Sequence, residues 1–229
     1  MDWRKKGLDN RMGMRKKTIN ILKEVNGTDV MTMLEAYDAE AVNRIPFTEK
    51  ELHKMYVDYA DPIICCARKL AQDNIFPLGN EVRAMFGHIS DYRINPTHKK
   101  NLEDAYGHFR RLNIDTFKIL CDEFDKVFLK YLQKHYHYDF REVHSTFLCD
   151  YSKMYFEAKN TYLKAQLSEH VGSDRLEGNI IQLYHSAAQK YVKLLLYFQE
   201  QHKGLEREKW KFILNISVGT VFAVIGLIL

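Results

Sequence analysis

The chain has 229 residues, of which 46% are hydrophobic and 28% are charged, as in globular proteins with a sizeable core. Its net charge of +4 is too small to indicate nucleic-acid binding by itself. Only 4 Pro and 11 Gly leave little material for the many turns of a β-sandwich, which argues against that class. Helix-forming residues dominate instead, so we expect an all-α fold.

The basic N-terminus is the first feature along the chain. Its first 17 residues contain seven Lys or Arg and two Asp, without the apolar stretch of a signal peptide. It is interpreted either as a solvated basic end or as a contact for anionic lipid headgroups or nucleic acid. We assign residues 1–47 to a basic N-terminal segment with a short helix.

Residues 48–203 are predicted to form a helical bundle domain with long antiparallel helices. Thr48 and Glu51 have the spacing of a capping box, which predicts a helix from there to about residue 73 with a kink at Pro62. Asn80 is expected to cap a second helix over 81–93. The sequence INPTHKK (94–100) then predicts a tight connection, because Pro96 disfavours a helical conformation in the residue before it.

Three more helices are predicted beyond this connection. Apolar residues recur at helical spacing over 99–134, which indicates one long helix. Another helix is expected over 140–168, and a last soluble helix begins near residue 174. Since Gly204 is the only helix-weakening residue before the apolar C-terminal segment, the last helix is expected to continue into that segment or to hinge at Gly204.

Residues 212–229 (FILNISVGTVFAVIGLIL) contain no charged side chain. As a helix they span about 27 Å, close to the ~30 Å hydrocarbon core of a bilayer. Trp210 and Lys211 precede them as interfacial anchors, and the basic residues on this side favour a cytoplasmic location for the large domain. We therefore expect 204–229 to be a juxtamembrane segment and a single transmembrane helix. The alternative is a buried C-terminal helix of a soluble fold.

Small and polar residues form one stripe of this predicted span. They are Asn215, Gly219, Ala223 and Gly226. Small stripes and an amide let helices approach and hydrogen-bond in lipid, so the stripe indicates self-association into a homo-oligomer, or else it has no consequence.

Four cysteines occur, namely Cys65, Cys66, Cys121 and Cys149, without the CxxC or Cys–His spacing of a zinc site. We expect them to be buried reduced thiols, with adjacent Cys65 and Cys66 on different faces of a helix, as suits a cytosolic domain. The sequence indicates neither a metal site nor a cofactor.

A short motif occurs twice, as FGH (86–88) and YGH (106–108). Helical spacing places His88 and His108 on the core-facing stripes of consecutive helices. Both lie ten positions from residue 98, so an antiparallel hairpin around that turn brings the two rings to one level. Gly87 and Gly107 are expected to let the two backbones come close there.

We predict a polar cluster around this pair inside the bundle. Besides the two histidines it would contain Arg111, Asp91 and Asp104, with Glu81 on the same helical row as His88. One interpretation is a satisfied structural network. Another is a site for an anionic small molecule or partner, because arginines at 83, 110 and 111 surround the histidines. A metal site is not expected, since the paired Glu-x-x-His signature of metal-binding bundles is absent.

Arg83 and His88 also match the R-x4-H pattern of HEPN ribonucleases, which gives an alternative catalytic pair. The residue after the arginine is Ala84, where that family commonly has a polar side chain. Five positions turn an ideal helix by about 140°, so the two side chains do not share a face.

The layout of a helical bundle, a Gly-His hairpin and one membrane segment resembles the small membrane effectors of bacterial anti-phage systems. The stretch NLEDAYGHFRRLNIDTFKIL (101–120) is similar in pattern to their helical domains. The resemblance implies a toxic effector, linked to a retron or to cyclic-nucleotide signalling, that perturbs the inner membrane. A sensor protein or nucleoprotein complex encoded nearby would be its partner. A third interpretation, besides the effector and the ribonuclease, is a passive tail-anchored adaptor.

Overall fold

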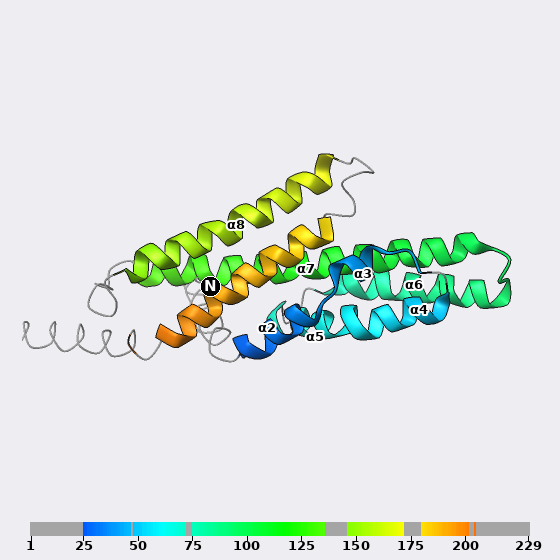
Figure 1. Ribbon diagram of the computed structural model, residues 1–229, viewed down its shortest axis with the longest axis horizontal. Coiled ribbons are helices and arrows are strands. Elements are labelled where there is room, and N and C mark those ends of the chain that lie inside the picture. Colours follow the sequence, from blue (N-terminus) through cyan, green and yellow to red (C-terminus); the bar gives the residue numbers. More distant parts are fainter. Residues whose placement is uncertain are drawn as a thin grey trace, which may run out of the picture.

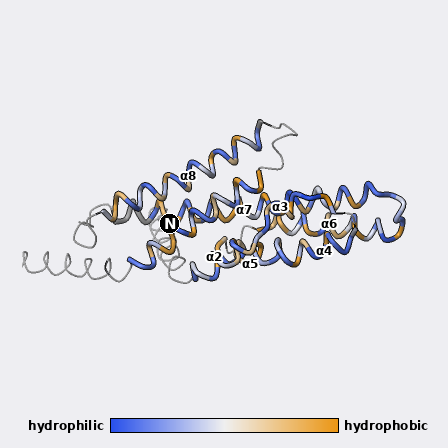
Figure 2. The backbone as a smooth tube through the Cα atoms, in the orientation of Figure 1, coloured by the Kyte–Doolittle hydropathy of each residue, from blue (hydrophilic) through white to orange (hydrophobic). Residues whose placement is uncertain are grey.

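The computed structural model describes residues 25–46, 48–71, 75–135, 146–171, 180–201 and 204. Most of these residues are in helices, and none of them is in a β-strand. The predicted all-α fold is therefore confirmed for this part of the chain (Figure 1). Hydrophobic and hydrophilic residues alternate along the helices, as expected for amphipathic helices around a shared core (Figure 2).

Two short helices come first, α2 (Gly27–Ala36) and α3 (Ala39–Asn43). The side chain of Asn26 caps α2 by accepting a hydrogen bond from the Thr28 amide, and that of Asp38 caps α3 in the same way. Leu34 and Val42 are fully buried in the common core. The end of the predicted N-terminal segment thus contributes directly to the packing of the bundle.

The next helical stretch consists of α4 (Glu49–Met55), the π-helical turn η1 (Tyr56–Ala60) and α5 (Asp61–Ala71). The predicted capping box is confirmed, since Thr48 and Glu51 each accept a hydrogen bond from the other's backbone amide. The irregularity near Pro62 takes the form of the wide turn η1, in which the Asp61 amide donates to the Tyr56 carbonyl. A π turn of this kind accommodates a proline that lacks an amide hydrogen.

Helix α6 (Phe76–Ile94) begins five residues earlier than predicted. The expected cap at Asn80 is wrong, because Pro77 in the first turn is already compatible with a helix start. The end of α6 agrees with the prediction, and the turn at 95–98 reverses the chain into the next helix.

Helix α7 (Lys99–His135) is the long helix that the sequence predicts. Its 37 residues extend over about 55 Å and form the axis of the molecule (Figure 1). The first half packs against α5 and α6. The second half lies beside α8 (Phe147–Val171) and a helix at residues 180–201 (Figure 1).

The cysteines are divided between core and surface. Cys66 and Cys121 are buried, whereas Cys65 and Cys149 are exposed, so the expectation of four buried thiols is wrong for two of them. The predicted separation of adjacent Cys65 and Cys66 onto different faces is confirmed. Burial raises the pKa of the Cys66 thiol to about 11, which keeps it protonated at neutral pH.

In the part of the chain that the structure describes, no helix is long and apolar enough to cross a bilayer. The predicted span 212–229, its anchors at 210 and 211, and the basic residues 1–24 lie outside the described residues.

Candidate functional site

The two Gly-His motifs meet across the α6–α7 hairpin. The rings of His88 and His108 are stacked, with centroids 5.3 Å apart and planes inclined by 18°. This confirms the predicted contact between the histidines. Neither ring is fully buried, and the side chain of His108 is 19% exposed. The pair therefore lies at the edge of the helix–helix interface, not in its centre.

The glycines beside the histidines do not have the predicted role. A Cβ atom added at Gly87 or Gly107 would meet no other atom within 4 Å. Close approach of the two backbones is therefore not what requires glycine at these positions. The hairpin is held by larger buried side chains, among them Met85, Ile89 and Phe109.

Glu81 is the carboxylate that joins the histidine pair. Its Oε2 lies 2.7 Å from Nδ1 of His108, and the two side chains are 21% and 19% exposed. Glu81 and His88 are separated by seven positions, or two helical turns, so they share one edge of α6. The spacing of seven positions between Glu81 and His88 was the sequence signal that placed this carboxylate near the histidine pair.

The other residues predicted for this cluster lie elsewhere. Arg111 and Asp91 are exposed, and Asp104 is half-buried without a role in the stacked pair. The predicted inclusion of Arg111 and Asp91 in a buried cluster is therefore wrong. Both residues lie more than 100° around their helices from the line of buried residues that forms the α6–α7 interface.

The arginines around the pair differ in burial. Arg83 is exposed on α6, and Arg110 is half-buried on α7. Nδ1 of His88 is buried and has no hydrogen-bond partner among the described residues. Arg83 and His88 thus occupy different environments.

Within the described residues, no group of three or more His, Cys, Asp or Glu side chains is arranged to hold a metal ion.

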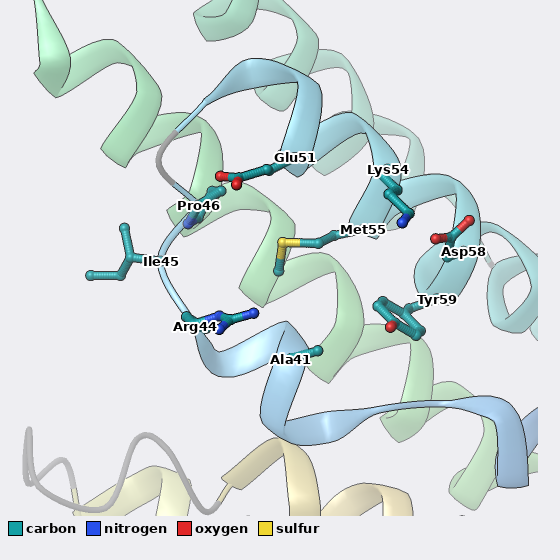
Figure 3. Close-up of a pocket in the computed structure, with 9 residues that line it drawn as sticks. All are labelled: Ala41, Arg44, Ile45, Pro46, Glu51, Lys54, Met55, Asp58 and Tyr59. Atoms are coloured by element: carbon teal, nitrogen blue, oxygen red, sulfur yellow. The ribbon is translucent and has the colours of Figure 1, made fainter.

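A cavity of about 310 Å³ lies between α3 and the α4–η1 stretch (Figure 3). Its apolar lining comes from Ala41, Ile45, Pro46, Met55 and Tyr59. Its charged lining consists of two cations and two carboxylates, from Arg44, Lys54, Glu51 and Asp58. All four charged residues are exposed, so the cavity is a solvated surface hollow of mixed charge.

A second set of polar contacts joins the second half of α7 to α8 and to the 180–201 helix. Tyrosine hydroxyls from α8 and the 180–201 helix donate to carboxylates, and we call this set the tyrosine–carboxylate seam. It comprises Asp122, Asp125, Tyr155, Tyr162, Glu169, Tyr184 and Tyr191.

Asp125 of α7 is the centre of the seam. Its Oδ1 accepts hydrogen bonds from Tyr155 and Tyr191, each at 3.0 Å, and its Oδ2 lies 2.6 Å from Nζ of Lys159. One carboxylate thus joins three helices. Tyr191 is completely inaccessible and Tyr155 is 7% exposed, so the hydroxyls have little access to water.

Asp122 and Glu169 extend the seam along the interface. Tyr162 donates to Asp122 over 2.6 Å, and Tyr184 donates to Glu169 over 2.7 Å. Glu169 also forms an ion pair with Lys118 of α7. The sequence predicted the last helix but not the carboxylate partners of its Tyr184 and Tyr191. The recurrence of tyrosine at helical spacing was the available signal.

The seam shifts the titration of its members in opposite directions. Burial, reinforced by the hydrogen bond to Asp125, raises the pKa of Tyr155 to about 12. Burial and the neighbouring carboxylates also raise the pKa values of Tyr162, Tyr184 and Tyr191. For Glu169, burial acts to raise the pKa, but the hydrogen bonds from Lys118 and Tyr184 prevail and lower it. The neutral phenols and the ionised Glu169 carboxylate are therefore stabilised together at neutral pH.

The 180–201 helix is also fastened to the N-terminal part of the bundle. Nε2 of His185 lies 2.7 Å from the Leu34 carbonyl, and Nε2 of Gln199 donates to the Val25 carbonyl over 2.8 Å. Burial lowers the pKa of His185, although the contact with the carbonyl acts to raise it. The helix that precedes the apolar C-terminal sequence is thus held from both sides.

No protein-family model, no curated protein and no solved structure gives a significant match to this chain.

Proposed function

We propose that the protein is a membrane-anchored, non-enzymatic effector of a bacterial anti-phage system. In this proposal the helical bundle responds to a sensor protein, a nucleoprotein complex or a ligand. Residues 212–229 then associate within the inner membrane and perturb it. The large domain would lie in the cytoplasm, and the active form would be a homo-oligomer.

One observation carries this proposal. The helix at 180–201 leads toward an uncharged 18-residue sequence, and the same helix is fastened into the bundle by Tyr184, Tyr191, His185 and Gln199. An element that precedes a predicted span and is bonded on two sides provides a physical link between the bundle and the membrane. The uncharged segment favours lipid because a helix that is apolar on all sides needs either a core or a bilayer.

Release of this helix exchanges its polar contacts for contacts with water or a partner, but its buried apolar side chains, among them Ile181 and Leu195, must be covered again by the partner. A buried hydrogen bond contributes only about 0.5–1.5 kcal/mol net, since water can replace it when the interface opens. A partner that competes for α7 or α8 would therefore shift the 180–201 helix through many small contributions. Such a partner must bind the open state more tightly than the closed one.

Membrane potential measured after expression in a bacterium tests the proposal. We expect overproduction of the full chain to populate the released state without the sensor, depolarise the cells and arrest growth, and overproduction of a chain without residues 212–229 to do neither. A scrambled 212–229 sequence of the same composition is the matched control for hydrophobicity, and fractionation reports whether each chain reaches the membrane. Depolarisation by the chain lacking 212–229 contradicts the proposal.

The same assay separates the two alternatives. A membrane-tethered ribonuclease that uses Arg83 and His88 requires that a folded His88→Ala protein lose toxicity. The exposed position of Arg83 and the stacking of His88 on His108 favour the non-enzymatic function instead. A passive tail-anchored adaptor requires that neither the full chain nor the shortened chain be toxic.

A further inference from the structure

Helix α8 carries an apolar stripe on its outer face. Phe156, Leu163 and Leu167 are 58%, 42% and 65% exposed. Their spacing of seven and four positions places all three within about 40° on a helical wheel. The buried residues of the same helix centre on a direction about 140° away. Single exposed apolar residues are ordinary, but three large ones that share one helix face indicate an interaction surface.

Two opposite charges flank this stripe on one side. Glu157 and Lys164 are both exposed and lie seven positions apart, so they share one side of α8. Asn160 is exposed midway between them. Lys153 is also exposed and lies one turn before Glu157 on this side, so the order along this edge is positive, negative, neutral, positive.

We propose that α8 pairs in antiparallel orientation with α8 of a second copy of this chain. The two-fold axis lies at the level between residues 160 and 161. This axis is perpendicular to both helices and lies in the interface. Rotation about it reverses the helix direction but leaves each side of the interface on the same side, so the same edge of the stripe meets itself in the second copy. Glu157 of each copy then lies at the level of Lys164 of the other.

The same register also fits the apolar residues. Residues that lie at the same level in the two copies have numbers that add up to 321. Phe156 of one copy therefore lies at the level of residue 165 of the other. The phenyl ring then enters the space between Leu163 and Leu167 of the second copy. A large side chain inserted between two residues of a facing helix is the usual packing of paired helices. Charge and shape thus specify one common register.

A second copy fits this surface better than a bilayer does. Helices that lie on a membrane carry Lys or Arg along the border of the apolar face, where anionic headgroups attract them. Here Lys153 and Lys164 lie on that border as well, but Glu157 stands between them and its carboxylate would be repelled by such headgroups. In the paired arrangement, the same carboxylate faces an ammonium group.

Cysteine cross-linking of the full chain in expressing cells tests the pairing. Exposed Cys65 and Cys149 are first replaced by serine, which leaves the buried Cys66 and Cys121. Asn160→Cys in this background is expected to give a covalent dimer with a short, membrane-permeable bismaleimide. Ser90→Cys on the exposed surface of α6 is the matched control and is expected to stay monomeric.

Charge exchange then identifies the partner as a second copy. Glu157→Lys or Lys164→Glu alone places like charges opposite each other twice, and each is expected to lower the dimer yield on the order of tenfold. The double exchange Glu157→Lys with Lys164→Glu is expected to restore it, since the attractions are re-formed with reversed sign.

Three results would overturn the pairing. These are equal cross-linking at positions 160 and 90, a double exchange that does not recover the dimer, and a Glu157→Lys chain that binds anionic vesicles more tightly without forming dimer. The last result would assign the stripe to lipid. Because cross-linking is read whether or not the cells depolarise, failure of the pairing and failure of the proposed effector function are separate outcomes.

Discussion

Tyr191 and Asp125 are 66 positions apart in the chain, yet the tyrosine hydroxyl lies 3.0 Å from Oδ1 of the carboxylate. This hydrogen bond joins the 180–201 helix to the second half of α7. Because Tyr155 donates to the same oxygen from α8, one acceptor fixes the relative positions of three helices. The stability of this half of the bundle should therefore depend strongly on a single aspartate.

Asp125→Ala is expected to destabilise the protein by about 3 kcal/mol, because it strands two buried hydroxyls and the Lys159 ammonium. For a chain of this size that corresponds to a fall in melting temperature of roughly 10 °C, measured by circular dichroism on the purified full chain. Asp115→Ala on the same helix is the control, since Asp115 makes only a half-exposed ion pair with Lys118. Equal shifts for the two variants would contradict a central role for Asp125.

Glu169 should make stability dependent on pH. Its pKa is lower in the folded protein than the ordinary value of 4.5, so its stabilising contribution is present above that value and is lost as the pH falls below it. Denaturant unfolding from pH 7 to pH 3 should reveal a difference between the wild type and Glu169→Gln. We expect this difference, on the order of 1 kcal/mol given the partial exposure of the pair, to vanish at the acidic end. A difference that is constant across the range would refute the assignment.

Gly27 and Gly87 should respond in opposite ways to alanine. A Cβ at Gly27 would lie 2.9 Å from Oε1 of Gln199 and 3.0 Å from Cδ2 of Leu196, so Gly27→Ala should disturb the contact of α2 with the 180–201 helix. We expect a loss of about 1 kcal/mol in the free energy of unfolding. At Gly87 a Cβ meets open space, and Gly87→Ala should stabilise α6 by about 0.5–1 kcal/mol. Two changes of the same sign would contradict the packing described for α2.

The contact between Glu81 and His108 can be measured by a double-mutant cycle. Glu81→Ala, His108→Ala and the double variant should give a coupling energy of about 0.5–1 kcal/mol, because both side chains are about one-fifth exposed. Replacement of Asp91 in place of Glu81 is the control, since Asp91 is exposed and should show no coupling to His108. Equal coupling energies of Glu81 and Asp91 to His108 would contradict the contact between Glu81 and His108.

Local patterns in the sequence were sufficient to predict several elements. Helical periodicity predicted α7 almost to the residue, and the capping box at Thr48 and Glu51 is present as expected. Equal distance from the turn at 95–98 placed His88 opposite His108, and the rings are stacked there. These features follow from sequence alone because they depend on contacts within one helix or across one short turn.

Other features were decided by packing between distant segments. The choice of Glu81 as the partner of His108, and the exposure of Arg111, depend on how α6 and α7 are rotated against each other. The tyrosine–carboxylate seam joins residues up to 66 positions apart. Periodicity identifies the face that a helix buries, but it does not identify the side chain that meets it. The tertiary structure decides which side chains pair, because a buried hydroxyl must donate its hydrogen bond to an acceptor on the helix that packs against it.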